Sequence, residues 1–267
     1  MKEKGRNNYM ELKGKVALVT GAAQGIGEAV VKSLAEQGVS VAAIDKNAEL
    51  LYKMRTNLQA LNQHVVAFPV DISDRQNVDK VVENIESTMG PIDILINVAG
   101  VLRIGNIDTL SDDDWDTTFA VNTTGVFYIC RAVIKNMKLR EKGVIVTVGS
   151  NAASVPRIGM AAYAASKAAV TSFTKTMALE LAEYNIRCNI VSPGSTETAM
   201  QKDMWKEDNG REAVIEGSLE NYKLGIPLKK LAQPSDIANA VLFLVSDQSS
   251  HITMHNMCID GGATLGV

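Results

Sequence analysis

The sequence predicts a single α/β domain built on one doubly wound, mostly parallel sheet with helices on both faces. Two patterns support this prediction: short apolar runs rich in β-branched residues recur along the chain, and amphipathic helical stretches separate them. The runs are continuously apolar instead of alternating, which is typical of strands covered on both faces. Helical spacers between such strands make parallel crossovers, so a doubly wound sheet follows.

Seven strands are expected along the chain. In order they are VALVT (16–20), VSVAAI (39–44), HVVAFPV (64–70), IDILIN (92–97), GVIVTVGS (143–150), IRCNIVS (186–192) and a last one within MHNMCI (254–259). No stretch rich in Pro, Gly or Ser divides the chain, and no internal repeat is found. We therefore expect one domain over residues 11–267, preceded by a short mobile leader at residues 1–10.

Composition excludes several classes of function. The 267 residues are 46% hydrophobic and 21% charged, as in soluble globular proteins, and no apolar run approaches the roughly 18 to 20 residues that cross a bilayer. The N-terminal stretch lacks the apolar centre of a secretory signal, so a cytoplasmic location is expected. A net charge of -3, with no clustered Lys and Arg among aromatics, argues against a nucleic-acid partner.

Cysteine and histidine suggest no chemistry of their own. Cys130, Cys188 and Cys258 are an odd number of thiols, each in or beside an apolar segment, and are expected to be reduced and buried. His251 and His255 have the spacing of zinc ligands on a helix, but no glutamate lies between them and the segment reads as a strand. No metal is predicted.

The strongest local signal for a ligand is TGAAQGIG at residues 20–27, which joins the first strand to the helical pattern EAVVKSLAEQG. Gly21 permits a tight turn, Gly25 lets the backbone approach a ligand, and Gly27 allows close helix packing. The start of the helix offers free N–H groups and a positive dipole end to a pyrophosphate. A Rossmann-like dinucleotide site is predicted, the alternative being a glycine turn without a ligand.

Acidic residues at the ends of the next two strands refine the prediction. Asp45 can accept hydrogen bonds from the adenosine ribose and repel a 2'-phosphate, which favours NAD over NADP, although Lys46 beside it could tolerate the phosphate. Asp71 and Ile72 end the third strand and could flank the adenine ring, or could simply begin the next helix.

YAASK at residues 163–167 sets Tyr163 and Lys167 four positions apart, so on a helix both side chains project from one face. Tyr9 and Lys13 have the same spacing in a polar stretch, so spacing alone does not establish chemistry. Oxidation of an alcohol requires its proton to leave, and a phenolate can accept it. Because the ordinary pKa of tyrosine is about 10, we expect nearby positive charge, from Lys167 and from the oxidised nicotinamide ring, to favour the phenolate.

The chain resembles the short-chain dehydrogenase/reductase family in a set of motifs and residues that occur in the family's order. They are TGAAQGIG, Asp45, NVAG (97–100), Asn122, Ser150, YAASK and PGSTET (193–198). The resemblance implies that Ser150 orients the substrate oxygen, that Asn122 holds a water for proton relay, and that Lys167 also bonds the nicotinamide ribose. Val98 departs from the family pattern, which more often has a second asparagine. The NAD contacts implied by these motifs are Gly21, Gln24, Gly25, Ile26, Gly27, Asp45, Asp71, Ile72, Asn97, Ala99, Gly100, Tyr163, Lys167, Pro193, Gly194, Thr196 and Thr198.

The substrate side of the site is expected between the loops at the carboxyl ends of the strands. Residues 195–224 form a long polar segment suited to a lid that excludes water, with Met200 in contact with the substrate. Arg103 and Arg157 follow the fourth and fifth strands, where either guanidinium could bind a carboxylate bidentately.

Longer stretches, among them VGSNAASVPRIGMAAYAASKAA and GIPLKKLAQPSDIA, resemble a family member that oxidises a carboxylated cyclohexadiene diol with NAD. That resemblance implies the same small-molecule substrate and a homotetramer. Two alternatives remain open: another short-chain reductase, such as one acting on an acyl-carrier ketone with NADPH, and a dinucleotide-binding regulator without catalysis.

Overall fold

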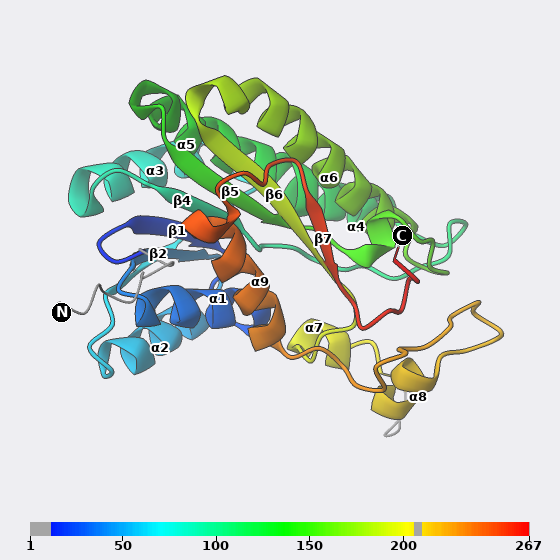
Figure 1. The fold of residues 1–267 in the computed structure, drawn as a ribbon. Helices are drawn as coiled ribbons and strands as arrows, with labels where there is room; N and C mark the ends of the chain where they lie inside the picture. Colours follow the sequence, from blue (N-terminus) through cyan, green and yellow to red (C-terminus); the bar gives the residue numbers. More distant parts are fainter. Residues whose placement is uncertain (1–11, 206–209, 267) are drawn as a thin grey trace, which may run out of the picture.

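A computed structural model describes residues 12–205 and 210–266; the predicted leader at residues 1–10 lies outside them. Within the described residues, seven parallel strands form one sheet in the order β3-β2-β1-β4-β5-β6-β7 (Figure 1). The strands are β1 (Val16–Thr20), β2 (Ser40–Asp45), β3 (Val65–Pro69), β4 (Ile94–Asn97), β5 (Gly143–Val148), β6 (Ile186–Pro193) and β7 (Asn256–Ile259). The predicted doubly wound fold is confirmed, and each predicted strand overlaps an observed one.

The helices cover both faces of this sheet. Figure 1 shows α1, α2 and α9 on one side and α3, α4, α5 and α6 on the other. Their bounds are α1 (Gly25–Glu36), α2 (Ala48–Gln59), α3 (Arg75–Met89), α4 (Asp112–Phe119), α5 (Val126–Arg140), α6 (Ala161–Leu181), α7 (Ala199–Lys202), α8 (Gly210–Glu216) and α9 (Pro234–Val245). A π-helical turn, η1 (Ala120–Gly125), joins α4 to α5, and short 3-10 turns follow β5, α6 and α9.

Two hydrophobic cores explain why the strands are apolar throughout. Along β1, Ala17 and Val19 belong to the core under α1, α2 and α9, while Val16 and Leu18 belong to the core under α3, α5 and α6. Side chains alternate between the faces of a strand, so a strand buried on both sides is apolar at most of its positions, and its few polar residues, such as Thr20 and Asn97, are buried. The apolar runs in the sequence have this origin.

The predicted lid contains two short helices, α7 and α8, which lie where the chain leaves β6 (Figure 1). Residues 206–209 of this segment are outside the described residues. Among the helices that the structure describes, none combines the length and the apolar character needed to cross a membrane.

The cysteines and histidines take ordinary positions. Cys130 and Cys188 are buried free thiols, whereas Cys258 is partly exposed, because β7 is an edge strand. His251 and His255 precede β7 in an irregular segment, so the predicted strand begins two residues later than expected. In residues 12–205 and 210–266, no group of three or more His, Cys, Asp and Glu side chains has a metal-binding arrangement.

Candidate active site

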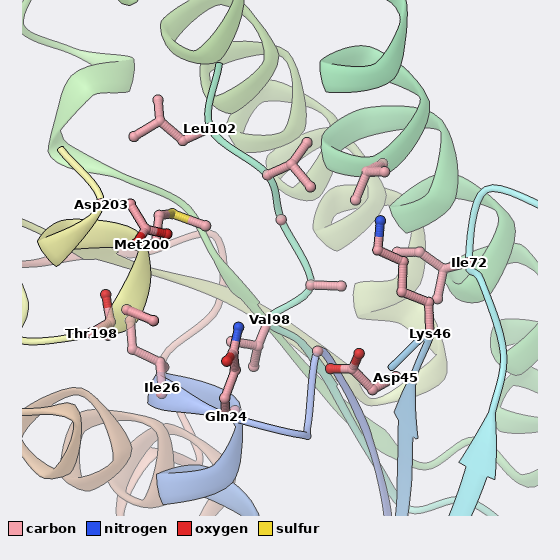
Figure 2. Close-up of a pocket in the computed structure, with 18 of the residues that line it drawn as sticks. Gln24, Ile26, Asp45, Lys46, Ile72, Val98, Leu102, Thr198, Met200 and Asp203 are labelled. Atoms are coloured by element: carbon pink, nitrogen blue, oxygen red, sulfur yellow. The ribbon is translucent and has the colours of Figure 1, made fainter. Parts of the chain in front are cut away.

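A cavity of about 480 Å³ opens at the carboxyl ends of β1, β2 and β4. The chain runs from β1 outward to β3 and then returns to β4 on the other side of β1, so the cavity lies where the strand order reverses. Crevices at such points are the usual ligand sites of doubly wound sheets. Figure 2 shows Asp45, Lys46 and Ile72 on one side, and Thr198, Met200 and Asp203 on the other.

The glycine turn forms the floor of this cavity. Gly21 and Gly25 have positive φ values of 66° and 59°, which residues with a Cβ rarely adopt. A Cβ on Gly27 would lie 1.9 Å from the carbonyl oxygen of Gly21, so only glycine lets α1 pack this closely on the turn. Gln24 is the N-cap residue of α1 but makes no side-chain cap bond. The first N–H groups of the helix therefore stay free at the cavity, as an anionic ligand requires.

The Asp45 carboxylate ties the end of β2 to the glycine turn. Its Oδ2 atom accepts a hydrogen bond of 3.1 Å from the N–H of Ala23, and its Oδ1 atom accepts one of 2.9 Å from the N–H of Asn47. Each carboxylate oxygen can accept more than one bond, so Asp45 can still bind ribose hydroxyls from the cavity wall. Lys46 lines the same wall, as the sequence analysis anticipated.

The turn after β3 is the next part of the wall. Asp71 Oδ1 accepts bonds of 2.9 and 2.7 Å from the backbone N–H and the hydroxyl of Ser73, which shape the turn before α3. Ile72 is largely buried yet lines the cavity, and Gly125 of η1 packs directly on it. Asp71 therefore shapes the turn and also lines the cavity, and Ile72 adds an apolar side chain to the same wall.

The segment after β4 forms the back of the cavity. Thr20 Oγ1 accepts bonds of 3.2 and 3.3 Å from the N–H groups of Val98 and Ala99, so β1 and β4 stay joined without an asparagine at position 98. Ala99 and Gly100 line the cavity, but the Asn97 side chain does not.

Asn97 is the clearest difference from the predicted set of NAD contacts. Its side chain is 2% exposed, and its Nδ2 atom donates to Cys130 Sγ and to Thr147 Oγ1, each at 3.3 Å. Leu95 faces the same core, and strand alternation turns position 97 to that face. Asn97 is therefore a polar residue of the core in this structure.

Tyr163 and Lys167 lie on the first turns of α6, where one helical face brings them together. Lys167 Nζ is 5.8 Å from the centre of the Tyr163 ring and donates a bond of 2.8 Å to the carbonyl oxygen of Val148. Ser150, at the start of the turn after β5, hydrogen-bonds the Tyr163 side chain and also accepts a bond of 3.1 Å from the N–H of Ala152. The structure thus brings three of the four predicted catalytic side chains into one cluster.

Burial controls the protonation of this cluster. It raises the pKa of Tyr163 above its ordinary value, an effect that the hydrogen bond from Ser150 only partly opposes. Burial also lowers the pKa of Lys167 to about 8. In the protein alone burial therefore has the largest effect on Tyr163, because removal of water from a buried group disfavours its charged form. That positive charge from Lys167 and an oxidised nicotinamide favours the phenolate stays a prediction.

Asn122, the fourth predicted catalytic residue, lies on η1 and is fully buried. Its Oδ1 atom accepts a bond of 2.8 Å from the N–H of Val101, and its Nδ2 atom donates bonds of 2.9 Å to the carbonyl of Val101 and 3.0 Å to Ser166 Oγ. The amide group is thus bound at both ends to the protein. The predicted water relay remains a prediction.

The PGSTET segment closes the cavity on the α7 side. Thr198 lines the cavity, caps α7 by accepting a bond of 3.2 Å from the N–H of Gln201, and lies against Gly25. Pro193 and Gly194 instead pair with Ile259 at the end of β7, and Thr196 is buried with its hydroxyl bonded to the carbonyl of Gly194. Only Thr198 of the four predicted contacts lines the cavity.

The two predicted arginine anchors have different surroundings. Arg103 lines the cavity, but its Nε atom lies 3.2 Å from Asp114 Oδ1 in an ion pair. Arg157 does not line the cavity. Burial, and secondarily the charge of Arg157, lower the pKa of Lys223 in the lid, so the two cations repel each other.

Most of the cavity wall belongs to no sequence motif. Met200 lines the cavity as predicted from its place in the lid, and Met204 from the same segment lines it too. Further lining residues without a motif are Val70, Val101, Leu102, Ile104, Val121, Ala199 and Asp203. The sequence also gives no sign that Lys223 lies near enough to Arg157 to feel its charge, because the two residues are far apart in the chain.

Comparisons with known proteins agree with this geometry. The family model described as short chain dehydrogenase matches residues 15–209. The chain is 63% identical to the 2,3-dihydro-2,3-dihydroxybenzoate dehydrogenase of Bacillus subtilis (strain 168), over 97% of this chain and all of that protein. It is 44% identical to the protein of the same name from Escherichia coli (strain K12), over 96% of this chain and all of that protein.

Among solved structures, the chain resembles a 7 alpha-hydroxysteroid dehydrogenase complexed with NADH and 7-oxo glycochenodeoxycholic acid. The TM-score is 0.89 at 31% sequence identity, and the match covers 97% of this chain and 98% of that one.

Proposed function

The chain belongs to the short chain dehydrogenase family, and on that premise we propose that it oxidises 2,3-dihydro-2,3-dihydroxybenzoate to 2,3-dihydroxybenzoate with NAD, in the synthesis of a catecholate siderophore. The observation that carries the proposal is the cluster of Tyr163, Lys167 and Ser150 at the carboxyl edge of the sheet that also forms the cavity. The substrate is taken from relatives that share 63% and 44% of their residues with this chain over nearly its whole length.

The residues around the cavity suit a dinucleotide. The uncapped start of α1 offers N–H groups to a pyrophosphate, and Asp45 lies at the end of β2, where it can bind ribose hydroxyls. A carboxylate at that position repels a 2'-phosphate, which favours NAD. When bound, the oxidised nicotinamide accepts the hydride, which is chemistry that no side chain supplies.

The protein's own part in the reaction is to move a proton. Tyr163, once ionised, accepts the proton of the substrate carbinol as the carbon–hydrogen bond breaks, and the carbinol becomes a ketone. Ser150 is bonded to the Tyr163 side chain and orients the substrate oxygen beside it. The ketone of a cyclohexadiene enolises to an aromatic ring, which makes the overall reaction downhill.

Positive charge near Tyr163 must offset the cost of its burial. Lys167 supplies one charge at 5.8 Å from the ring centre while it is protonated, and an oxidised nicotinamide would bring a second. At such distances in a partly dry site, a unit charge is worth several kcal/mol at most, and it acts to lower the raised pKa of Tyr163. We infer that the phenolate forms when the cofactor is bound.

Arg157 suits the substrate carboxylate better than Arg103 does. Asp114 already neutralises Arg103, whereas Arg157 has no acidic partner within 4 Å among residues 12–205 and 210–266. Lys223 adds a second positive charge on the lid side, so an anion between them would relieve their repulsion.

The test is to incubate the purified protein with NAD and the dihydrodiol acid while following NADH absorbance and the catechol product. Formation of both in equal amounts is the expected result. Oxidation of NADPH by an acyl-carrier ketone, with no reaction of the dihydrodiol acid, would favour the reductase alternative. Tight NAD binding without turnover of either substrate would favour a regulator.

A further inference from the structure

Ser166, the residue before Lys167, has no assigned part in the reaction, yet its hydroxyl connects the backbone of Tyr163 to the side chain of Asn122. It is fully buried. Its Oγ atom donates a bond of 2.8 Å to the carbonyl of Tyr163 and accepts one of 3.0 Å from Asn122 Nδ2. The carbonyl of Ser166 also accepts a bond of 3.3 Å from Thr123 Oγ1. Ser166 therefore makes two hydrogen bonds from α6 to η1, one through its side chain and one through its backbone.

The direction of these bonds fixes the Asn122 amide. A hydroxyl has a single proton, and that of Ser166 is directed to the carbonyl of Tyr163, so toward Asn122 it can only accept. Asn122 must then present its NH₂ group to Ser166, which leaves Oδ1 to accept the N–H of Val101 at 2.8 Å. If the amide were reversed, its NH₂ group would face the N–H of Val101 and its oxygen would face the carbonyl of Val101. Both hydrogen bonds between Asn122 and Val101 would then be lost.

Asn122 in turn holds the cavity wall against the catalytic lysine. Val101 lines the cavity and is bound to the Asn122 amide through both its N–H and its carbonyl. A Cβ on Gly100 would lie 3.3 Å from Asn122 Oδ1 and 3.5 Å from Lys167 Nζ, so the wall, the amide and the ammonium group touch at one point.

We propose that Ser166 is a positioning residue, which acts through Asn122 to set the distance between the Tyr163 and Lys167 pair and the wall formed by Gly100 and Val101. The inference rests on the proposed function for its kinetic consequence, since that wall would hold the nicotinamide end of NAD against Tyr163. A misplacement of about 1 Å can cost about a hundredfold in rate, so one buried hydroxyl is enough to affect turnover.

The kinetic test compares Ser166→Ala with Thr174→Val. Thr174 is the matched control because it is also a fully buried hydroxyl of α6 that bonds one carbonyl, that of Val170, and one side chain, that of Thr147. We expect kcat for the dihydrodiol acid to fall about tenfold to a hundredfold in Ser166→Ala and to stay within about twofold in Thr174→Val. The NADH dissociation constant, from fluorescence titration, should change less than about threefold in both variants.

A double-mutant cycle tests whether the effect passes through Asn122. If it does, Ser166→Ala combined with Asn122→Ala has the same kcat as Asn122→Ala alone, because the connection is already lost. Rate losses that multiply would overturn the proposal. Unchanged kcat in Ser166→Ala, or an equal loss in Thr174→Val, would overturn it too.

Hydrogen exchange provides a test that needs no turnover and so stands apart from the proposed function. In Ser166→Ala the Asn122 amide loses one anchor, so the Val101 N–H should exchange at least about tenfold faster, with no change in Thr174→Val. Unaltered protection of Val101 in Ser166→Ala would refute the positioning role, whatever the substrate proves to be. Failure of the wild-type protein to oxidise the dihydrodiol acid would instead refute the proposed function.

Discussion

At the scale of single residues, burial acts against the charged forms of both side chains of the YAASK motif. It keeps Tyr163 protonated and lowers the pKa of Lys167 to about 8, so the lysine is still charged at pH 7 but loses its charge at higher pH. The charge balance needed for a phenolate therefore depends on the cofactor as well as on the lysine. On the proposed mechanism, Tyr163 would become a base only in the complex with the cofactor.

Removal of the Tyr163 hydroxyl should abolish turnover. We expect Tyr163→Phe to lower kcat at least about a thousandfold, because the phenol is the group proposed to take the carbinol proton and Lys167 is mostly protonated at pH 7. NAD affinity should change little, since the ring and its packing are retained. The measurement is NADH formation together with fluorescence titration of NADH, and appreciable NADH formation by the variant would remove tyrosine from the mechanism.

The pH dependence of kcat/KM for NAD should follow the loss of the positive charge of Lys167. With a pKa of about 8, this side chain is charged at pH 7 and neutral at pH 9.5 in the free protein. Lys167→Met should therefore lower kcat/KM for NAD about a hundredfold at pH 7, and the gap to wild type should narrow above pH 8, where the wild-type lysine has also lost its charge.

The control for this experiment is Lys175→Met, which removes an exposed cation from the same helix. It should leave kcat/KM unchanged at every pH. A constant or widening gap between wild type and Lys167→Met as pH rises would show that the charge of Lys167 is not what matters.

The carboxylate anchor can be tested with the two arginines side by side. Arg157→Ala should raise KM for the acid about tenfold to a hundredfold, the cost of a lost charge-assisted bond, while Arg103→Ala should have a smaller effect because Asp114 already binds it. With the methyl ester of the substrate, which lacks the charge, both variants should resemble wild type. An unchanged KM for the acid in Arg157→Ala would dismiss it as the anchor.

At the scale of elements, the turn from β1 to α1 and the end of β4 show how backbone geometry selects residues. Gly27 is needed because α1 packs directly on the carbonyl of Gly21, and Thr20 joins the two central strands through its hydroxyl. The same strand geometry sends Asn97 into the core, although it belongs to a motif at the cavity. Motif membership therefore does not imply that a side chain reaches the ligand.

A methyl group on Gly27 should disturb this turn. Its Cβ would lie 1.9 Å from a backbone oxygen, which cannot move without displacing the turn, so Gly27→Ala should lower the free energy of unfolding by about 1–3 kcal/mol or more. Denaturant unfolding measures this loss. Glu28→Ala, at the exposed next position of α1, should change it by less than about 0.5 kcal/mol. Equal stability of the two variants would contradict the packing argument.

At the scale of the whole molecule, the sheet order brings together segments that are far apart in the chain. The cavity takes its walls from the turn after β1, the ends of β2 and β4, and α7, so a ligand there bridges both halves of the sheet. Such a ligand binds only the folded protein and must stabilise it.

Dinucleotide binding should accordingly raise the melting temperature. NAD at a hundred times its dissociation constant contributes about 2.7 kcal/mol, or about 5 to 10 °C for a chain of this size. NADP at the same concentration should raise it less, because Asp45 repels the added phosphate. Asp45→Asn should make the melting-temperature increases caused by NAD and NADP more similar. Lys46→Gln, which removes the neighbouring cation, should make them differ more. Equal shifts by NAD and NADP in the wild-type protein would refute the cofactor preference.

The sequence alone determined the features that are local in the chain: the strands, the glycine turn with its free helix start, and the one-face spacing of Tyr163 and Lys167. Apolar periodicity, positive φ and helical pitch act over a few residues, so they can be recognised without coordinates. Only the tertiary structure decided the raised pKa of Tyr163, the core position of Asn97, the partners of Asn122 and the ion pair of Arg103 with Asp114. The burial of a side chain and its hydrogen-bond or ion-pair partners depend on groups that folding brings from distant parts of the chain. A local sequence pattern therefore cannot predict them.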